Sequence, residues 1–376
     1  MPWQEVSTVS LRKEFVHLAQ AEEANMRALC RRFRVSPSTG YKWLGRFRAA
    51  GASALADQSR RPYTSPTRTS PEVEQAILSA RDLHPAWGAR KLRVWLLNQG
   101  HHPMPSPSTI TAILERHGRI DAAEAAKHRP WVRFERPAPN DLWQMDFKGQ
   151  FPLAQGWCYP LTVLDDHSRF AVGLQACGDQ RWPTVQQQLT GVFRRYGLPQ
   201  EMLMDNGAPW GADWDHPYTP LTVWLLRLGI GVSHSRPYHP QTQGKEERFH
   251  RTLKAEVLQG RSFADLAGCQ EAFDPWRAVY NLERPHAALG LATPASRYQV
   301  SPRPFPEQLP AIEYGPQDQV RRVQAHGQIS FHSRSFRVSK AFRGYPVALR
   351  ATSRDGLWEV FFLSHRIAQL DLRETV

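Results

Sequence analysis

The chain has 376 residues, a net charge of +13 at pH 7 and four cysteines. Its length is enough for roughly two to four domains, and its positive balance favours an acidic partner such as nucleic acid. The cysteines form no C-x-x-C pair, no stretch reaches the ~18 apolar residues of a membrane span, and the polar N-terminus does not resemble a secretory signal. The sequence therefore predicts a cytoplasmic protein that makes no use of a membrane.

The charge is spread unevenly along the chain. Residues 1–140 hold 22 Lys and Arg against 12 acidic residues, residues 141–300 hold 15 against 16, and residues 301–376 hold 11 against 7. Basic flanks around a nearly neutral centre predict DNA-binding modules attached to a catalytic module. On charge alone, a merely soluble basic protein remains an alternative.

The first module, residues 1–56, has the apolar spacing of three helices, with Leu11, Phe15 and Leu18 on the first of them. Ser36 is expected to cap the third helix, and Pro37 is expected to be its first residue. This pattern predicts a helix-turn-helix, although a plain three-helix bundle fits it too. The side chains expected to read a major groove are Ser38, Thr39, Lys42 and Arg46.

A basic linker rich in Pro, Ser and Arg, residues 57–70, follows this module. Within it, Arg60 and Arg61 are expected either to enter a minor groove or to remain solvated. Residues 71–125 predict a second, winged helix-turn-helix, whose last helix again begins with Ser and Pro. Ser108 and Thr109 are its candidate DNA contacts. Two such units in tandem predict that the protein binds a long DNA site through two separate modules.

Three acidic residues mark the centre of the chain, residues 136–300. Asp146 lies in an alternating strand pattern, LWQMDF, which places it opposite an apolar face. Asp205 directly follows the short apolar strand of residues 201–204, at the sheet edge where α/β proteins place their sites. Glu247 lies on a predicted helix, on a stripe with Arg251 and Lys254 and beside the buried stripe that includes Phe249. Only a folded core can bring these three acids together.

Three converging carboxylates are the ligand set that two hard divalent cations need for phosphodiester chemistry. We therefore expect two Mg²⁺ ions, which Mn²⁺ can replace. Asp165 and Asp166 are the rival acids, but they lie between two apolar strands, so a hairpin turn explains them without chemistry. We expect Asp166 and Asn206 to lie beside the ligands and support them.

Several segments resemble a known family. They are WQMDF, LDDHSR, MDNG, HPQTQGKEERFHRTLK and YNLERPHAALGLATPASRY, and they are similar to the catalytic core shared by retroviral integrases and bacterial insertion-sequence transposases, most of all the transposases. The resemblance implies an RNase H-like fold with an Asp, Asp, Glu metal site at Asp146, Asp205 and Glu247. It also implies that Gln243 and Lys254 approach the DNA end.

One departure from the family concerns the step from the second Asp to the Glu. This step is 42 residues here, against the family's usual step of about 35, and APWGADWDHPYTP looks like a local insertion. Lys245 and Arg251 complete the candidate DNA contacts of this module. No GxxxxGK[ST] loop occurs, so the sequence does not support a nucleotide cofactor.

The tail, residues 310–376, changes to short β-rich runs and predicts a small all-β barrel. In similar transposases and integrases a comparable tail contacts DNA, although a solvated barrel surface is an alternative. Its candidate DNA contacts are Arg321, Arg322, Arg334 and Arg337.

The predicted fold is thus multidomain: α-helical helix-turn-helix modules, an α/β RNase H-like catalytic core and a small all-β C-terminal barrel. The predicted function is that of a transposase, which binds the terminal inverted repeats of its element, cleaves the ends and joins the 3′-hydroxyl to target DNA. Its partners would be double-stranded DNA and further copies of itself, in the bacterial nucleoid. A catalytically silent DNA-binding regulator and an RNase H-fold nuclease without strand transfer are the alternatives.

Overall fold

The computed structural model describes residues 7–57, 68–120, 135–211, 218–234 and 244–373. Arg60, Arg61 and Gln243, three of the predicted DNA contacts, lie outside these residues. Contacts along the backbone divide the chain into two units, Met1–Arg68 and Thr69–Val376. In the part of the chain that is described, no helix has both the length and the apolar composition that crossing a bilayer requires.

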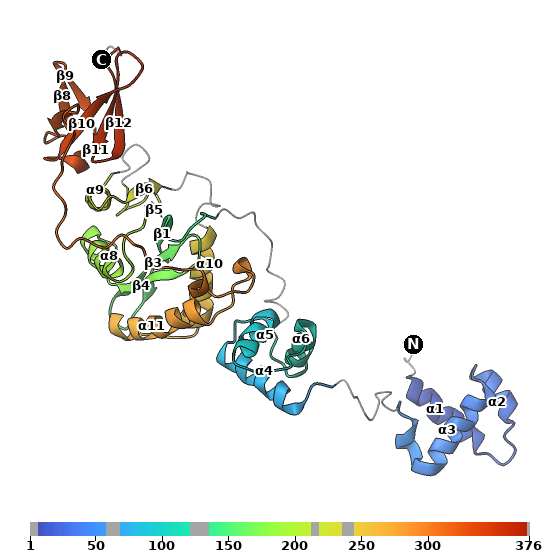
Figure 1. Cartoon of the computed structure of the whole chain (residues 1–376). Coiled ribbons are helices and arrows are strands. Elements are labelled where there is room, and N and C mark those ends of the chain that lie inside the picture. The colour runs from blue at the N-terminus through green and yellow to red at the C-terminus, as the bar shows by residue number, and fades with distance from the viewer. Residues whose placement is uncertain (1–6, 58–67, 121–134, 212–217, 235–243, 374–376) are drawn as a thin grey trace. The chain divides into compact units, whose positions relative to one another are not determined.

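The first unit is a three-helix bundle (Figure 1). The Ser36 side chain caps the third helix by accepting a hydrogen bond from Thr39 N at 3.2 Å, as predicted. Gly40 allows close packing, because a Cβ atom there would lie 2.7 Å from Cys30 Sγ and 2.8 Å from Phe15 Cζ. One expectation was wrong: Leu11 is 42% exposed, and the first helix instead buries Phe15, Val16 and Ala19. The elements are α1 (Thr8–Ala19), α2 (Met26–Arg32), α3 (Pro37–Ala50) and η1 (Gly51–Leu55).

The second unit begins with another set of three helices around a buried cluster that includes Trp87, Leu92 and Ile110. Ser106 caps the last of them exactly as Ser36 caps α3, through a 3.2 Å hydrogen bond from Thr109 N. No strand occurs in residues 68–120, so the described part of this module lacks the wing that we predicted. The helices are α4 (Pro71–Leu83), α5 (Ala89–Asn98) and α6 (Pro107–Arg116).

A six-stranded sheet forms the centre of the second unit. Three strands, β4, β3 and β1, pair antiparallel, and β5 and β6 continue the sheet from β1 in parallel. Three antiparallel strands followed by two parallel ones are the arrangement of an RNase H-like core, as predicted. The strands are β1 (Leu142–Phe147), β2 (Phe151–Pro152), β3 (Trp157–Asp165), β4 (Ala171–Cys177), β5 (Glu201–Met204) and β6 (Gly231–His234).

Helices cover both faces of this sheet (Figure 1). One hydrophobic cluster joins Trp143 and Met145 of β1 to α8 and α9, and a second joins β3 and β4 to α10 and α11. Because side chains alternate along a strand, Asp146 lies on the face opposite to Trp143 and Met145, which is the α10 face. The helices are α8 (Trp182–Tyr196), α9 (Pro220–Arg227), α10 (Gly244–Leu253), its π-helical continuation η3 (Lys254–Leu258) and α11 (Leu266–Leu282).

The C-terminal part is all-β, as predicted, but the described strands do not close a barrel. Four strands form an antiparallel sheet in the order β12-β11-β10-β7, and β8 and β9 form a separate hairpin. Their hydrophobic cluster also includes Val223 and Leu226 of α9, a helix whose other side packs on the central sheet. The elements are β7 (Gln319–Arg322), β8 (Gln328–Phe331), β9 (Arg334–Arg337), β10 (Pro346–Ala351), β11 (Leu357–Phe362) and β12 (His365–Asp371).

Candidate active site

Asp146 lies near the end of β1, directly opposite Thr162 of β3 in the antiparallel register. Its side chain is 24% exposed, and its Oδ1 accepts a hydrogen bond from Phe147 N at 2.8 Å. The alternation predicted for this strand is confirmed, because Trp143 and Met145 are fully buried on the other face. Asp146 therefore lies at the partly exposed end of β1, and the buried residues before it anchor the strand in the core.

Asp205 follows the last residue of β5. The parallel register pairs Gln144 with Leu203, so continuing both strands by two residues brings Asp205 level with Asp146. Asp205 Oδ1 accepts a hydrogen bond from Gly207 N at 3.0 Å, and the His234 ring donates from Nδ1 to Asp205 O at 2.7 Å. The turn that carries this acid is thus tied to β6, the neighbouring strand.

The segment after Asp205 contains the apparent insertion. Trp210 is 1% exposed and stacks on Phe147, with 5.5 Å between the ring centroids. Asn206, which we expected beside the ligands, is half-buried in this turn. Residues 212–217 of the insertion lie outside the described residues. The part that is described is therefore anchored in the core by an indole ring that the sequence reasoning did not single out.

Glu247 lies on the first turns of α10. It is exposed together with Arg251 and Lys254, while Phe249 and Leu253 are buried, so the two stripes predicted for this helix are both present. The neighbouring Glu246 points the other way and is 1% exposed. The helix therefore presents one glutamate to the core and the other to its open side.

The three predicted acids act on one another electrostatically. Burial, together with repulsion from Asp205 and from Glu247, raises the pKa of Asp146 to about 7. Burial also raises the pKa of Asp205, against the hydrogen bond from Gly207. Negative charge at this edge of the sheet is thus concentrated and poorly solvated, which is a condition that a divalent cation relieves.

The donor set suits such a cation, because all three groups offer the hard carboxylate oxygens that Mg²⁺ and Mn²⁺ prefer. In the residues that the structure describes, however, no three His, Cys, Asp or Glu side chains are arranged closely enough to hold an ion. The trio is therefore a group of mutually repelling acids and does not form a closed ligand cage.

Asp165 and Asp166 lie in the turn between β3 and β4, as predicted, and both are fully buried. Asp166 accepts hydrogen bonds from Gln144 Nε2 and Arg136 N, each at 2.7 Å, and forms an ion pair with Lys245. The Lys245 side chain is only 15% exposed. Our assignment of Lys245 to DNA contact is thus at odds with this pairing, because its ammonium group binds the β3–β4 turn.

Three further residues lie near the acids and were not predicted from the sequence: Thr162, His250 and Lys148. Thr162 and His250 contact each other at 2.8 Å between Oγ1 and Nε2, and His250 Nδ1 lies 4.0 Å from Asp146 Oδ2. Burial and the nearby charge of Lys148 lower the pKa of His250 to about 4. Lys148 in turn lies close enough to Lys254 for the two cations to interact. The only sequence signal was the four-residue step from Glu246 to His250, which places both on one helix face.

The predicted DNA-reading side chains lie at the starts of α3 and α6. Ser38, Lys42, Ser108 and Thr109 are exposed, whereas Thr39 and Arg46 are half-buried. The Thr39 hydroxyl lies 2.8 Å from Ser36 Oγ, so it belongs to the helix cap.

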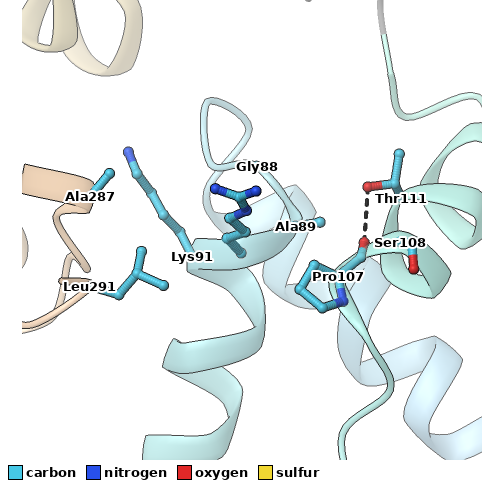
Figure 2. Close-up of a pocket in the computed structure, with 9 residues that line it drawn as sticks. Gly88, Ala89, Lys91, Pro107, Ser108, Thr111, Ala287 and Leu291 are labelled. Carbon is cyan, nitrogen blue, oxygen red and sulfur yellow. Dashed lines mark hydrogen bonds between the residues drawn. The ribbon is translucent and has the colours of Figure 1, made fainter. Parts of the chain in front are cut away.

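A hollow of about 430 Å³ lies beside Ser108 (Figure 2). The starts of α5 and α6 line it together with Ala287 and Leu291, and Lys91 extends along it. Burial and repulsion from Arg284 lower the pKa of Lys91 to about 7. The surroundings of Lys91 thus disfavour its charged form, next to a predicted DNA contact.

The four arginines predicted for the C-terminal part differ in their surroundings. Arg322 and Arg337 are exposed, while Arg321 and Arg334 are half-buried. Arg334 donates a hydrogen bond to Leu372 O at 2.6 Å, and the Arg321 guanidinium lies 5.5 Å from the Phe331 ring centre. Arg321 and Arg334 thus also make contacts within the C-terminal part.

Family models match four parts of the chain. Two models of the integrase core domain match residues 136–240 and 228–294, and the model of the IS481 family transposase C-terminal domain matches residues 318–376. A homeodomain-like model matches residues 39–114, and a helix-turn-helix model matches residues 11–63. These matches cover the helical, α/β and all-β parts described above.

Among curated proteins, the chain is similar to two insertion-element proteins. It is 26% identical over 237 residues to the IS407 uncharacterized 31.7 kDa protein of Burkholderia multivorans, a match that covers 60% of this chain and 82% of that protein. It is 23% identical over 259 residues to the IS476 uncharacterized 39.2 kDa protein of Xanthomonas euvesicatoria, which covers 66% and 70% of the two chains.

Two solved structures are also similar. They are the simian T-cell lymphotropic virus intasome in complex with a PP2A regulatory subunit (14% identity, TM-score 0.40, 78% of this chain and 95% of that chain) and the HTLV-2 integrase catalytic core domain in complex with magnesium (14%, 0.34, 43% and 99%). The integrase core domains, the IS481 transposase C-terminal domain and the insertion-element relatives together support a bacterial insertion-sequence transposase with an integrase-like core.

Proposed function

We propose that this protein cleaves the phosphodiester bonds at the ends of its insertion element and joins the freed 3′-hydroxyl groups to target DNA. The observation that carries the proposal is the electrostatic coupling of Asp146 with Asp205 and Glu247. These acids come from β1, from the end of β5 and from α10, three elements of one integrase-like core.

The three carboxylates would hold two Mg²⁺ ions, which Mn²⁺ can replace. When bound, the ions would supply the charge that activates an attacking oxygen and stabilises a leaving one. Asp146 would serve both ions, because Asp205 and Glu247 each repel its charge. Asp205 and Glu247 would each complete one of the two sites.

The basic side chains around the trio would position the DNA. Lys254 and Arg251 are exposed on the same side of α10 as Glu247, and Lys148 lies near Lys254. Such cations bind backbone phosphates and so fix the scissile bond without reading its sequence. In the first step, water attacks phosphorus and the bond to the 3′ oxygen breaks. In the second, the released 3′-hydroxyl attacks a target phosphorus and displaces the target's own 3′ oxygen.

The helical modules would supply the sequence specificity. We propose that residues 1–56 and 71–125 bind the terminal inverted repeats, with the linker of residues 57–70 between them, and that residues 136–300 and 310–376 form the catalytic and C-terminal modules. Two element ends must be joined in one reaction, so several copies of the chain would assemble on double-stranded DNA in the bacterial nucleoid.

The proposal is tested with the purified full chain and labelled duplexes that carry the inverted repeats flanking its gene. With Mg²⁺ or Mn²⁺, we expect cleavage at the element end and joining to a target plasmid, and we expect Asp146→Asn to lose both. Asp265→Asn is the matched control, because Asp265 is an exposed helix cap that accepts a hydrogen bond from Gly268 N at 2.8 Å, a role that Asn can also fill.

The products distinguish the proposal from its alternatives. Specific binding without cleavage in either metal would identify a DNA-binding regulator. Cleavage without joined products would identify a nuclease. Full activity of Asp146→Asn would overturn the assignment of the metal ligands.

A further inference from the structure

A single hydroxyl group lies between the strand that carries Asp146 and the helix that carries Glu247. Thr162 Oγ1 is 2.9 Å from Asp146 O, 2.9 Å from Glu246 Oε2 and 2.8 Å from His250 Nε2. Thr162 is fully buried, and Glu246 is 1% exposed. A hydroxyl has one proton and two lone pairs, so it donates to one neighbour at a time and accepts from at most two others.

The contacts of Thr162 join β1 to α10 at the position of Asp146 along the strand. Thr162 stands directly opposite Asp146 in the β1–β3 register, and Glu246 and His250 are four residues apart on the side of α10 that faces the sheet. Glu247 is the residue next to Glu246 in the chain. A shift of α10 along the sheet would therefore break the contacts of Thr162 and move Glu247 relative to Asp146 by the same distance.

The remaining packing of α10 does not define this position as sharply. Phe249 and Leu253 bury the helix against β3, β4 and α11 through apolar contacts, which have little directional preference. Hydrogen bonds, in contrast, weaken steeply with distance and angle. The ion pair between Lys245 and Asp166 fixes the start of the helix to the β3–β4 turn, and Thr162 fixes the next turn to β1 and β3.

We propose that Thr162 is a positioning residue for the catalytic acids, and that its hydroxyl sets the placement of Glu247 relative to Asp146 by binding Glu246 and His250 of α10. The inference depends on the proposed function only in that it takes Asp146 and Glu247 as ligands of the same metal ions. Thr162 itself contacts neither the DNA nor the ions in this role.

The test compares two substitutions that differ in the hydroxyl. Thr162→Val keeps the branched shape and removes the hydroxyl, whereas Thr162→Ser keeps the hydroxyl. We expect Thr162→Val to weaken Mn²⁺ binding to the intact protein by at least about tenfold, the effect typical of losing a residue that orients metal ligands, and Thr162→Ser to stay within about threefold of wild type. Isothermal titration calorimetry without DNA measures this directly.

Thr190→Val is the matched control. Thr190 is half-buried on α8, and its hydroxyl donates to Gln186 O at 2.8 Å. This variant also loses a hydrogen-bonded hydroxyl, so it should change the unfolding temperature while leaving Mn²⁺ affinity as in wild type. A Thr162→Val protein that binds Mn²⁺ as tightly as Thr190→Val would overturn the inference.

A second variant covers the case in which Thr162→Val does not fold, which circular dichroism would reveal. His250→Leu keeps Thr162 and removes the helix partner, and we expect the same loss of Mn²⁺ affinity, with wild-type affinity contradicting the inference. Failure of the proposed function has a different signature: a wild-type protein that binds Mn²⁺ but neither cleaves nor joins DNA. Absence of Mn²⁺ binding in wild type would overturn both.

Discussion

Two pairs of aspartates end neighbouring strands of the central sheet, and they differ in the hydrogen bonds that they receive. Asp165 accepts bonds from Asn140 N, Ser168 N and Ser168 Oγ, and Asp166 binds two donors and the Lys245 ammonium. The acids at the ends of β1 and β5 instead bind amides of their own local turns and repel one another.

The difference shows why burial alone does not identify a catalytic acid. Burial raises the pKa of Asp165, but three hydrogen bonds act in the opposite direction and offset part of the effect of burial on its charge. At Asp146, burial and two like charges act together and raise the pKa to about 7. Acids with donors hold the fold together, and acids among like charges are suited to bind a cation.

We expect the largest effect on the rate of DNA cleavage, which should distinguish Asp146 and Asp205 from Asp165. Asp146→Asn or Asp205→Asn should lower the rate of end cleavage by about a thousandfold or more, because each removes several kcal/mol of metal-based transition-state stabilisation. Asp165→Asn should instead reduce the yield of folded protein while the folded fraction keeps cleaving. Single-turnover cleavage, normalised to folded protein, measures both effects.

The outcome that would break the comparison is a reversal of these roles. If folded Asp165→Asn protein lost cleavage as completely as Asp146→Asn, the turn between β3 and β4 would belong to the catalytic machinery.

The next largest effect is on stability, and it concerns the buried ion pair between Lys245 and Asp166. Lys245→Met leaves the Asp166 carboxylate buried without its cation, and breaking such a pair by removing one partner costs about 3 kcal/mol or more. We expect a lower urea midpoint for this variant. Arg251→Met, which changes an exposed residue of the same helix, is the control and should unfold as wild type does.

The repulsion at the site predicts a dependence of stability on pH. Burial and like charges raise the pKa of Asp146 in the folded protein to about 7, above its ordinary value of 3.8. Protonation of this carboxyl therefore stabilises the folded protein fully below pH 3.8, and this stabilisation is lost as the pH rises through 7. Asp146→Asn has no such charge. Without divalent cations it should therefore unfold roughly 2 to 4 °C above wild type at pH 8, with a smaller difference at pH 5.

Thermal unfolding in EDTA at the two pH values measures this prediction. Adding Mn²⁺ at pH 8 should raise the unfolding temperature of wild type and not that of Asp146→Asn. Equal pH profiles for the two proteins would show that the acids at this edge do not repel one another.

The smallest expected effect is on the stability of the two helical modules, whose cap residues are distant in sequence from the three acids. Ser36 and Ser106 make matching hydrogen bonds at the starts of α3 and α6. Ser36→Ala and Ser106→Ala should each cost about 1 kcal/mol of stability in their own helical module, with no change in Mn²⁺ affinity. A loss of Mn²⁺ affinity in either variant would mean that general destabilisation, and not the acids themselves, explains the effects above.

The sequence predicted those features that depend on neighbours along the chain. The alternation around Asp146, the strand before Asp205, the two stripes of α10 and both Ser-Pro caps follow from local periodicity and capping chemistry, and the structure contains all of them. The structure differs from the prediction in three places: residues 68–120 contain no strand that could form a wing, the described C-terminal strands do not close a barrel, and Leu11 of the first helix is exposed.

The features that were missed depend on contacts across the fold. Thr162 and Glu246 are 84 residues apart in the sequence, and Asp166 and Lys245 are 79 apart. Only the placement of α10 on the sheet decides that Lys245 meets Asp166 and that Glu246 meets Thr162. A lysine in a basic segment has the same local pattern whether it binds DNA or a buried carboxylate, so periodicity could not distinguish the two.

The central claim is that Asp146, Asp205 and Glu247 hold divalent cations between them. Anomalous diffraction from crystals of the protein grown with Mn²⁺ tests it most directly. We predict two peaks at the edge of the sheet, one shared by Asp146 and Asp205 and one shared by Asp146 and Glu247. Peaks bound by other side chains, or Glu247 turned away from an ion that binds the two aspartates, would contradict this account.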